Sequence, residues 1–310
     1  MMPMNDVVCL RAVISGKPVR TDRYIAEACP DLSRSRIQKL ISEGKALVDG
    51  KAVKASFLLT GGEEIRLELP EPEPTEIKAV DIPLDIIYED DDLLIINKPK
   101  DMVVHPSAGH SDDTLVNAIL YHCHGNLSGI NGIMRPGIVH RIDKNTTGSL
   151  IVCKNDRAHQ FLADKLKVHD ITRIYRGIVV GHLKEEEGVV DQPIGRDRKD
   201  RKRMGIDRER GRRAVTHYKV LQRLNGYDDC EFQLETGRTH QIRVHMASLG
   251  HPLLGDDLYG SAKNPFNLCG QTLHASVIGF EHPTTHQYVS FKAELPDYYK
   301  KLIVKLGGAL

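Results

Sequence analysis

The densest polar stretch of the chain, residues 137–148, contains one carboxylate, Asp143, among histidine, arginine, lysine and threonine side chains. It follows a glycine-rich loop and precedes an apolar run, Ser149–Cys153, that is typical of a buried strand. An acid on a loop at the edge of a sheet is well placed to reach a substrate. The alternative is a structural ion pair between Asp143 and Arg141, which is common for arginine and aspartate so close in sequence.

A second polar cluster surrounds Arg243 and includes two histidines. We expect a helix over Thr239–Leu249, with Thr239 as its N-cap and Gly250 as its stop. Arg243 then lies one turn after His240 on the same helix face. The two histidines are five residues apart rather than four, so they do not share a face as zinc-peptidase ligands do, and we expect no metal site.

Two further features lie between these clusters. Tyr175 and Arg173 fall on the same face of a strand expected over Arg173–Val180, although a strand tyrosine is more often a packing residue than a catalytic one. Residues 196–213 hold ten basic side chains against four acidic ones and almost no apolar ones. That composition is typical of a flexible basic loop able to bind phosphates, and the alternative is a solvated hairpin tip.

The first part of the chain has the pattern of a small α+β unit. We expect helices over Thr21–Ala28 and Ile37–Glu43, and strands over Ala46–Val48, Ala52–Lys54 and Glu64–Leu69. Three basic residues lie in and just before the second helix: Arg34, Arg36 and Lys39. They are weak evidence for nucleic-acid binding by themselves, because a run of charges is usually a solvated face.

Alternating proline and glutamate over Pro70–Pro74 marks the clearest domain boundary, because such a segment prefers an extended form and cannot pair in a sheet. A larger unit follows over Ile82–Val304. Its expected strands are Ile86–Tyr88, Leu93–Asn97, Ser149–Cys153, Arg173–Val180, Ala214–Leu221, Cys230–Leu234, Thr272–Ile278 and Tyr288–Ala293. Its expected helices are Thr114–His122, Arg157–His169 and Thr239–Leu249. Strands outnumber helices without regular alternation, which favours an α+β fold with a mixed, largely antiparallel sheet.

The composition of the chain sets broad limits on its class. Its 310 residues, with 43 basic and 42 acidic side chains, suggest two or three domains of a globular protein. No apolar run approaches the ~18 residues that span a bilayer, and no signal peptide is visible. The six cysteines are scattered, as expected for reduced thiols in a cytoplasm. Residues 63–92 hold twelve acidic against two basic side chains, so the rest of the chain is basic.

Three motifs, in the same order along the chain, resemble those of the RluA-type pseudouridine synthases. Residues 140–143 and 146–148, His-Arg-Ile-Asp and Thr-Thr-Gly, resemble the family's H-R-L-D and T-S-G sequences, with Ile142 and Thr147 as mild departures. The run Thr172–Tyr175 resembles the second motif, which ends in tyrosine. The third motif is matched by Gly237–His245 and the segment that continues to Asp256. Shorter matches are Asn97-Lys98-Pro99, Val104-His105-Pro106 and Leu273-His274-Ala275.

Val19–Leu69 separately resembles the S-four-type RNA-binding module, with Ser33–Arg36 at its recognition helix. The two resemblances imply an RNA-binding domain at residues 17–70, a Pro/Glu linker at 71–81 and a catalytic domain of the pseudouridine synthase fold at 82–306. This combination is similar to members that modify large-subunit ribosomal RNA. We therefore expect ribosomal RNA or a pre-ribosomal particle as the partner, and a monomer.

The resemblance implies isomerisation of uridine to pseudouridine in RNA, without cofactor or metal. It implies Asp143 as the catalytic carboxylate, Arg243 as its ion-pair partner, and Tyr175 stacked on the uracil as a general acid or base. Arg141 and His140 would lie near the flipped nucleotide. Phosphate contacts are expected from two basic groups: Arg34, Arg36 and Lys39 in the first domain, and Arg201, Lys202 and Arg203 in the second.

Elementary chemistry agrees with these roles and leaves the route open. The glycosidic bond must break, the uracil must rotate, and a carbon–carbon bond must form. A carboxylate can attack the ribose, attack the base, or take part in an elimination, while a closed pocket holds the flipped base. One alternative is a catalytically silent RNA-binding or ribosome-assembly factor, which has no need of Asp143, Tyr175 and Arg243 together. A glycosidase is disfavoured because only one acid stands in a motif cluster.

Overall fold

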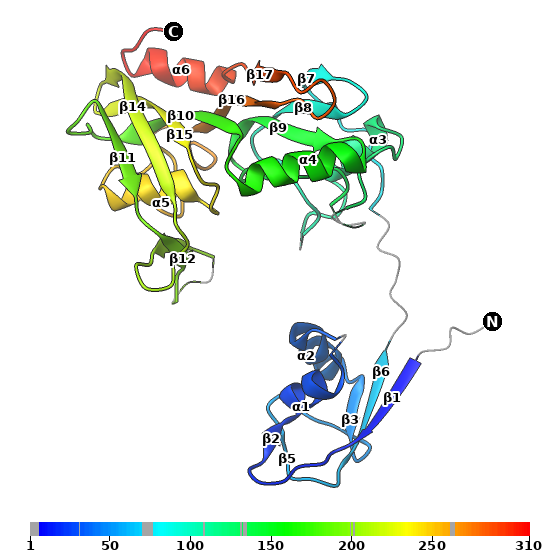
Figure 1. The fold of residues 1–310 in the computed structure, drawn as a ribbon. Coiled ribbons are helices and arrows are strands. Elements are labelled where there is room, and N and C mark those ends of the chain that lie inside the picture. The colour runs from blue at the N-terminus through cyan, green and yellow to red at the C-terminus, as the bar shows by residue number, and fades with distance from the viewer. Residues whose placement is uncertain are drawn as a thin grey trace. The chain divides into compact units, whose positions relative to one another are not determined.

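The computed structural model places the chain in two compact units that divide between residues 75 and 76 (Figure 1). The described residues are 6–30, 32–69, 77–107, 109–130, 132, 135–198, 200, 202–260 and 264–310. Of the expected linker, residues 77–81 are described and form neither helix nor strand, and the remainder lies outside the described residues. Each unit has a hydrophobic core of its own, so each is described by itself.

The first unit packs two helices against a small antiparallel sheet in the order β1-β6-β3-β4. Its elements are β1 (Asp6–Arg11), β2 (Val19–Arg20), α1 (Thr21–Ala28), α2 (Arg34–Ser42), β3 (Ala46–Val48), β4 (Lys51–Ala52), β5 (Leu58–Leu59) and β6 (Glu64–Leu69). Helix α2 begins three residues before the expected Ile37, because the Ser33 side chain caps it by accepting the Arg36 N–H at 3.3 Å. Strand β1, which the sequence pattern did not reveal, pairs along all of β6 and lies before the expected boundary at residue 17.

A nine-stranded sheet forms the centre of the second unit, in the order β11-β14-β15-β10-β16-β9-β8-β7 with β17 also on β16. The strands are β7 (Ile86–Glu89), β8 (Leu93–Lys98), β9 (Thr147–Cys153), β10 (Thr172–Val180), β11 (Glu187–Asp191), β14 (Val215–Leu224), β15 (Tyr227–Leu234), β16 (Leu273–Glu281) and β17 (Tyr288–Lys292). Only β16 and β9 pair in parallel, so the expectation of a mixed, largely antiparallel sheet is confirmed. The register places Ala275 of β16 beside Gly148 on one side and Tyr175 on the other, which brings two motifs together across one strand.

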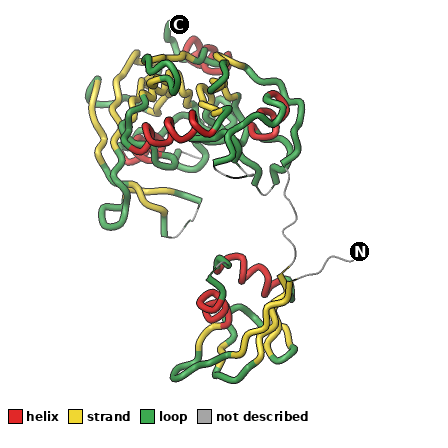
Figure 2. The backbone as a smooth tube through the Cα atoms, turned by 45° about the vertical axis from the view of Figure 1, so that its right-hand side comes forward, coloured by secondary structure: helices red, strands yellow, loops and turns green. Residues whose placement is uncertain are grey.

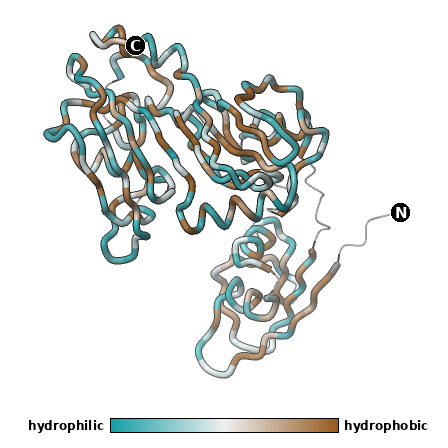
Figure 3. The backbone as a smooth tube through the Cα atoms, turned by 45° about the horizontal axis from the view of Figure 1, so that its top comes forward, coloured by the Kyte–Doolittle hydropathy of each residue, from teal (hydrophilic) through white to brown (hydrophobic). Residues whose placement is uncertain are grey.

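Helices cover both faces of this sheet (Figures 1 and 2). They are α3 (Leu115–His122), α4 (Asp156–Lys167), α5 (Gln241–Ser248) and α6 (Asp297–Lys305). Strand β8 shows why both faces are covered: Leu93 and Ile95 pack in the cluster that includes α4, whereas Leu94 and Ile96 pack in the cluster that includes α3 and α5. All four are fully buried, and each contributes about 1.5–3 kcal/mol by leaving water. Figure 3 shows the hydrophobic colouring along inner strands of this unit.

The structure differs from the sequence-based expectations in three places. Helix α5 begins at Gln241, and its N-cap is His240 in a left-handed conformation (φ 57°) rather than Thr239. The basic stretch is a hairpin of β12 (Ile194–Arg196) and β13 (Met204–Ile206), not an unstructured loop. The sequence pattern also missed β11 and α6. In the part of the chain that the structure describes, no helix is long and apolar enough to cross a membrane.

Candidate active site

Asp143 lies on the loop immediately before β9, and its side chain is 21% exposed. The loop is held by its own turn, in which the Thr146 N–H donates to the Asp143 carbonyl at 3.0 Å. It is also fixed to β9, because His140 Nε2 accepts the Ile151 N–H at 3.0 Å. Burial, together with the charge of Arg173, lowers the pKa of His140 to about 3, so the ring remains a neutral acceptor. His140 thus positions the loop that carries Asp143.

Lys98, the central residue of the short Asn-Lys-Pro match, fixes the other side of this loop. Its side chain is fully buried at the end of β8. Its ammonium donates to the carbonyl of Pro99 at 2.7 Å and to those of Met102 and Lys144 at 2.9 Å. Burial lowers the pKa of Lys98 to about 7, and the nearby Asp143 opposes that shift. Three acceptors match the three N–H bonds of an ammonium, so Lys98 ties β8 to the residue that follows Asp143.

Gly148 shows why the motif ends in glycine. Its φ is +107°, and a Cβ there would collide with the carbonyl oxygen of Ala275 on the neighbouring strand. The preceding residue, Thr147, lies 2.8 Å through its Oγ1 from His274 Nδ1. Burial lowers the pKa of His274 to about 4, which keeps this ring neutral in the sheet. The close approach of β9 and β16 therefore sets where the Asp143 loop ends.

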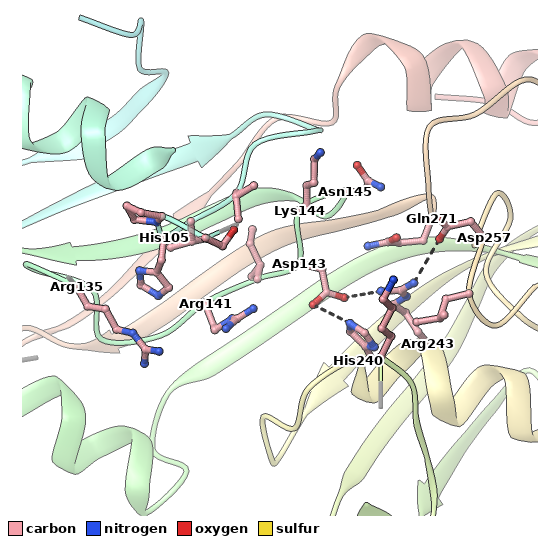
Figure 4. A pocket seen from close by; sticks show the side chains of 17 residues that line it. His105, Arg135, Arg141, Asp143, Lys144, Asn145, His240, Arg243, Asp257 and Gln271 are labelled. Atoms are coloured by element: carbon pink, nitrogen blue, oxygen red, sulfur yellow. Dashed lines mark hydrogen bonds and ion pairs between the residues drawn. The ribbon is translucent and has the colours of Figure 1, made fainter. Parts of the chain in front are cut away.

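Arg243 on α5 joins Asp143 to a second carboxylate, Asp256 (Figure 4 shows the contact with Asp143). Its Nη1 donates to Asp143 Oδ2 at 3.0 Å, while Nε and Nη2 donate to the two oxygens of Asp256 at 2.7 and 2.9 Å. Arg243 is 5% exposed and Asp256 1% exposed. Burial opposes the charged form, but hydrogen bonds and charge from Asp256 and then Asp143 raise the pKa of Arg243. Asp256 therefore anchors the guanidinium, which donates one of its remaining N–H groups to Asp143.

His240, the left-handed residue before α5, approaches Asp143 from the same side (Figure 4). Its Nε2 lies 3.7 Å from Asp143 Oδ1, and its Nδ1 lies 2.8 Å from the hydroxyl of Tyr259. That hydroxyl also accepts the Met204 N–H at 2.8 Å, so Tyr259 joins the imidazole to the backbone of Met204. Burial lowers the pKa of His240, which favours the neutral ring.

Tyr175 forms the wall of a small cavity, about 60 Å³ in volume, that Asp143 and Arg243 also line. It is 9% exposed, and the other walls mix apolar side chains, Ile142 and Leu273 among them, with polar and charged ones. Burial raises the pKa of Tyr175, whereas the charge of Arg173 opposes the shift, so the phenol keeps its proton near neutral pH. An aromatic face beside the carboxylate is the surface on which a flat base can stack.

Outside Asp143 a larger cavity of about 530 Å³ opens, and most of the charged side chains that line it are basic (Figure 4). The basic side chains that line it include those of Arg135, Arg141, Lys144 and Lys202. Arg141 is exposed, and so lies at the entrance of the cavity. Asp143 pairs with Arg243 rather than with Arg141. This arrangement disfavours the structural Asp143–Arg141 ion pair. A positive cavity around one aimed carboxylate suits a polyanionic substrate.

The basic hairpin reaches this site through two of its three predicted contact residues. Lys202 lines the 530 Å³ cavity, and the guanidinium carbon of Arg203 lies 5.4 Å from the centre of the Tyr259 ring. Arg201 lies outside the described residues.

In the first unit, the Arg34 side chain forms an ion pair within its own domain. Its Nη2 lies 3.0 Å from Asp22 Oδ2, and Asp22 is fully buried, also bonded to Arg20 and Gln38. The hydrogen bond from Arg20 is the main cause that holds the pKa of Asp22 well below its ordinary value, and burial opposes it. Two other predicted RNA-contact residues, Arg36 and Lys39, are exposed on α2.

Four residues near Asp143 had no assigned role in the sequence-based prediction: Lys98, His240, Asp256 and Tyr259. The first three lie in matched motifs, which was a usable signal. Tyr259 lies beyond the matched segment, and nothing in the sequence pointed to it. No group of three or more His, Cys, Asp or Glu side chains that could hold a metal is present within the described residues.

Comparisons with known proteins assign the chain and its fold to one class. The profile of the RNA pseudouridylate synthase family matches residues 92–248, and that of the S4 domain matches residues 19–65. In the solved human RNA Pseudouridylate Synthase Domain Containing 1, 27% of aligned residues are identical, with a TM-score of 0.58 over 73% of this chain and 87% of that one. The chain belongs to the RNA pseudouridylate synthase family.

Two full-length relatives are particularly similar. An RNA pseudouridine synthase of Bacillus subtilis, described as uncharacterized, is 49% identical over 94% of this chain and 95% of its own length. The ribosomal large subunit pseudouridine synthase D of Zymomonas mobilis is 46% identical over 96% of this chain and 95% of its own length. The protein is therefore an RNA pseudouridine synthase, an isomerase, with an RNA-binding S4 domain at its N-terminal end.

Proposed function

We propose that this enzyme isomerises specific uridines of large-subunit ribosomal RNA, with Asp143 as the catalytic carboxylate. The observation that carries the proposal is the position of Asp143: Arg243 aims it, and it lies where a basic cavity meets the small cavity of Tyr175. A nucleotide flipped into this site would place its base on the tyrosine and its ribose near the carboxylate. The ribosomal target is supported by relatives named ribosomal large subunit pseudouridine synthase D at 43–46% identity.

The chemistry assigns a separate task to each side chain. The bond between C1′ of the ribose and N1 of uracil breaks, a bond from C1′ to C5 forms, C5 loses its proton, and N1 gains one, so that the product is an isomer of uridine. Asp143 supplies the carboxylate for attack on the ribose, attack on the base or elimination, and Arg243 orients it. Tyr175 stacks on the uracil and is the nearest candidate for general acid or base. Each of the three routes requires the same aimed carboxylate.

Binding of the surrounding RNA is assigned to the basic residues. Arg141 at the entrance would brace the gap that the flipped nucleotide leaves in the RNA stack, while His140 holds the loop behind it. Lys202 and Arg203 on the hairpin, and exposed cations of the first unit, would contact phosphates. A monomer acting in the cytoplasm remains part of the proposal.

Mapping pseudouridines in ribosomal RNA tests the proposed target. Large-subunit RNA from a strain lacking the gene should lose pseudouridine at one or a few positions, and expression of the wild-type chain should restore them. Purified wild-type protein should then convert the same positions in an unmodified transcript. If the ribosomal pattern is unchanged while transfer RNA loses pseudouridine, the enzyme acts on another RNA and the ribosomal proposal is wrong.

A further inference from the structure

Arg173 is a buried arginine of the active-site region to which the proposed reaction gives no task. It lies near the start of β10, two residues before Tyr175, and is 8% exposed. Both side chains line a third cavity, of about 540 Å³, that Asp143 also lines. Arg173 therefore faces the same space as Asp143 and Tyr175.

The guanidinium of Arg173 has no carboxylate partner among the described residues. Its Nη2 donates to the carbonyl of Glu235 at 3.3 Å, and its buried Nε has no hydrogen-bond partner in the part of the chain that the structure describes. Two other buried or half-buried arginines of this unit, Arg243 and Arg176, each pair with a buried aspartate. A buried charge without a partner is costly, so an unpaired guanidinium beside a cavity indicates a site for an anion from outside the chain.

The chain leaves room for this guanidinium at Gly237. A Cβ on Gly237 would lie 2.5 Å from Arg173 Nη1, so any larger residue would displace the group. Gly237 is also the first residue of the third matched motif. The loop before α5 and the strand β10 thus enclose Arg173 without supplying a negative charge.

The surroundings of Arg173 are positive as well. Arg141 and Arg238 line the same cavity, and Asp143 is the only carboxylate among its described lining residues. Arg238 donates through Nε to the carbonyl of Arg213 at 2.9 Å rather than to an acid. Burial is the largest cause that lowers the pKa of His169, and the charges of Arg173 and Arg238 lower it further. The cavity therefore favours an anion at several points.

We propose that Arg173 binds a backbone phosphate next to the target uridine, and so fixes the reacting ribose against Asp143. Phosphate is the anion that every RNA substrate carries, and a planar guanidinium with free N–H groups suits it well. The inference rests on the proposed role of Asp143, since a ribose at that carboxylate brings its flanking phosphates into the adjoining cavity. Arg173 would then contact substrate directly, whereas His140 and Asp256 act through other residues.

Neutral linkages in the RNA test this contact. We would take an RNA fragment around a uridine that the wild-type protein converts, from whichever RNA carries it. Three versions of this RNA are compared. One has phosphates throughout, and in each of the other two a neutral methylphosphonate replaces the phosphate on the 5′ or on the 3′ side of that uridine. All three versions carry 2′-O-methyl groups at both of these linkages. Binding is measured for wild type, Arg173→Met, Arg173→Lys and a charge-matched control, Lys301→Met, on the exposed face of α6.

Wild type and Lys301→Met should lose about tenfold or more in affinity at one of the two neutral linkages. Arg173→Met should bind all three RNAs equally weakly, because the contact is already absent. Arg173→Lys should retain part of the discrimination, since it keeps the charge without the fork of donors.

Two results would overturn the inference. Wild type could bind all three RNAs equally well, a result that needs no variant and so holds even if Arg173→Met fails to fold. Alternatively, Arg173→Met could lose as much affinity as wild type at the same linkage, so that the two effects add. Neither result depends on Asp143 being catalytic, because binding is measured without turnover. Failure of the proposed chemistry would instead appear as an active Asp143→Asn variant.

Discussion

Replacing Arg243 by methionine separates the structural from the chemical role of the guanidinium. The wild-type side chain makes two hydrogen bonds to Asp256, at 2.7 and 2.9 Å, and one to Asp143, at 3.0 Å. Methionine fills a similar space but donates none of them. Asp256 is 1% exposed, so the variant leaves a buried carboxylate without its partner, whereas Asp143 is 21% exposed and keeps access to water.

The two losses should have different sizes. Breaking a buried ion pair from one side costs about 3–5 kcal/mol, so the free energy of unfolding should fall by that amount. The reaction should slow by about a hundredfold or more, because a carboxylate displaced by about 1 Å loses that much. A double variant, Arg243→Met with Asp256→Asn, should regain part of the stability by removing the buried charge, yet should stay as slow as Arg243→Met.

Tritium release provides the assay for the rate. RNA labelled with tritium at C5 of uracil loses the label when C5 bonds to the ribose, so single-turnover release at saturating RNA reports the chemical step. Urea unfolding gives the stability of each variant. Arg176→Met is the matched control, because Arg176 pairs with the fully buried Asp229 at 2.5 Å outside the cavities of the site. It should destabilise the fold and leave the rate of the folded enzyme almost unchanged.

A double variant that recovered both stability and rate would refute this reasoning, since Arg243 would then only neutralise Asp256. An Arg243→Met enzyme within a few-fold of the wild-type rate would do the same. Equal slowing in Arg176→Met would show that the assay reports unfolding rather than the orientation of Asp143.

Three further predictions follow from the same contacts. Burial lowers the pKa of Lys98 to about 7 from an ordinary 10.5, so between these pH values the unfolded chain binds more protons at Lys98 than the folded chain does. The free energy of unfolding of the wild type should therefore rise relative to that of Lys98→Met from pH 7 to pH 10, as measured by urea unfolding. Lys202→Glu with Arg203→Glu should weaken RNA binding and lower the slope of log affinity against log salt by roughly 0.7–0.9 per lost phosphate contact, measured by titration at several salt concentrations. A chain lacking residues 1–75 should fold by circular dichroism, bind RNA more weakly in the same titration, and keep its single-turnover rate at saturating RNA.

Each of these has an outcome that would count against it. A Lys98→Met difference that stays flat with pH would mean that burial does not depress the lysine's pKa in the folded enzyme. The variant with Lys202→Glu and Arg203→Glu could keep the wild-type slope of log affinity against log salt, as the control Lys301→Glu on α6 should. The hairpin would then be a solvated surface without phosphate contacts. A well-folded truncation slowed a hundredfold at saturating RNA would show that the first unit takes part in building the active site.

Local pattern was sufficient for much of the fold. The strands expected over Leu93–Asn97 and Ser149–Cys153 correspond to β8 and β9 within two residues at each end, because continuous apolar runs are typical of buried strands. The strands β12 and β13 were not predicted, because three-residue strands in a highly charged segment carry no apolar alternation. Thr239 looked like a helix cap, but the left-handed His240 intervenes, and nothing in the sequence marks that conformation.

The site could be predicted only in part. Asp143 and Arg243 are a hundred residues apart, and no spacing rule joins them; the motif resemblance did, and the structure shows the contact at 3.0 Å. The role of Asp256 depends on how α5 packs beside the following turn, and that of Lys98 on three carbonyls from two loops. Such contacts arise from tertiary packing, which the order of residues along the chain does not reveal.

Replacement of Asp143 by asparagine tests the central claim most directly. The change keeps the shape of the side chain and removes its charge, so RNA binding and the free energy of unfolding should stay close to wild type. Single-turnover tritium release at saturating RNA should fall below about one per cent of the wild-type rate, because loss of an essential reacting group costs orders of magnitude. Release well above that level from a folded, RNA-bound Asp143→Asn enzyme would contradict the assignment of Asp143 as the catalytic carboxylate.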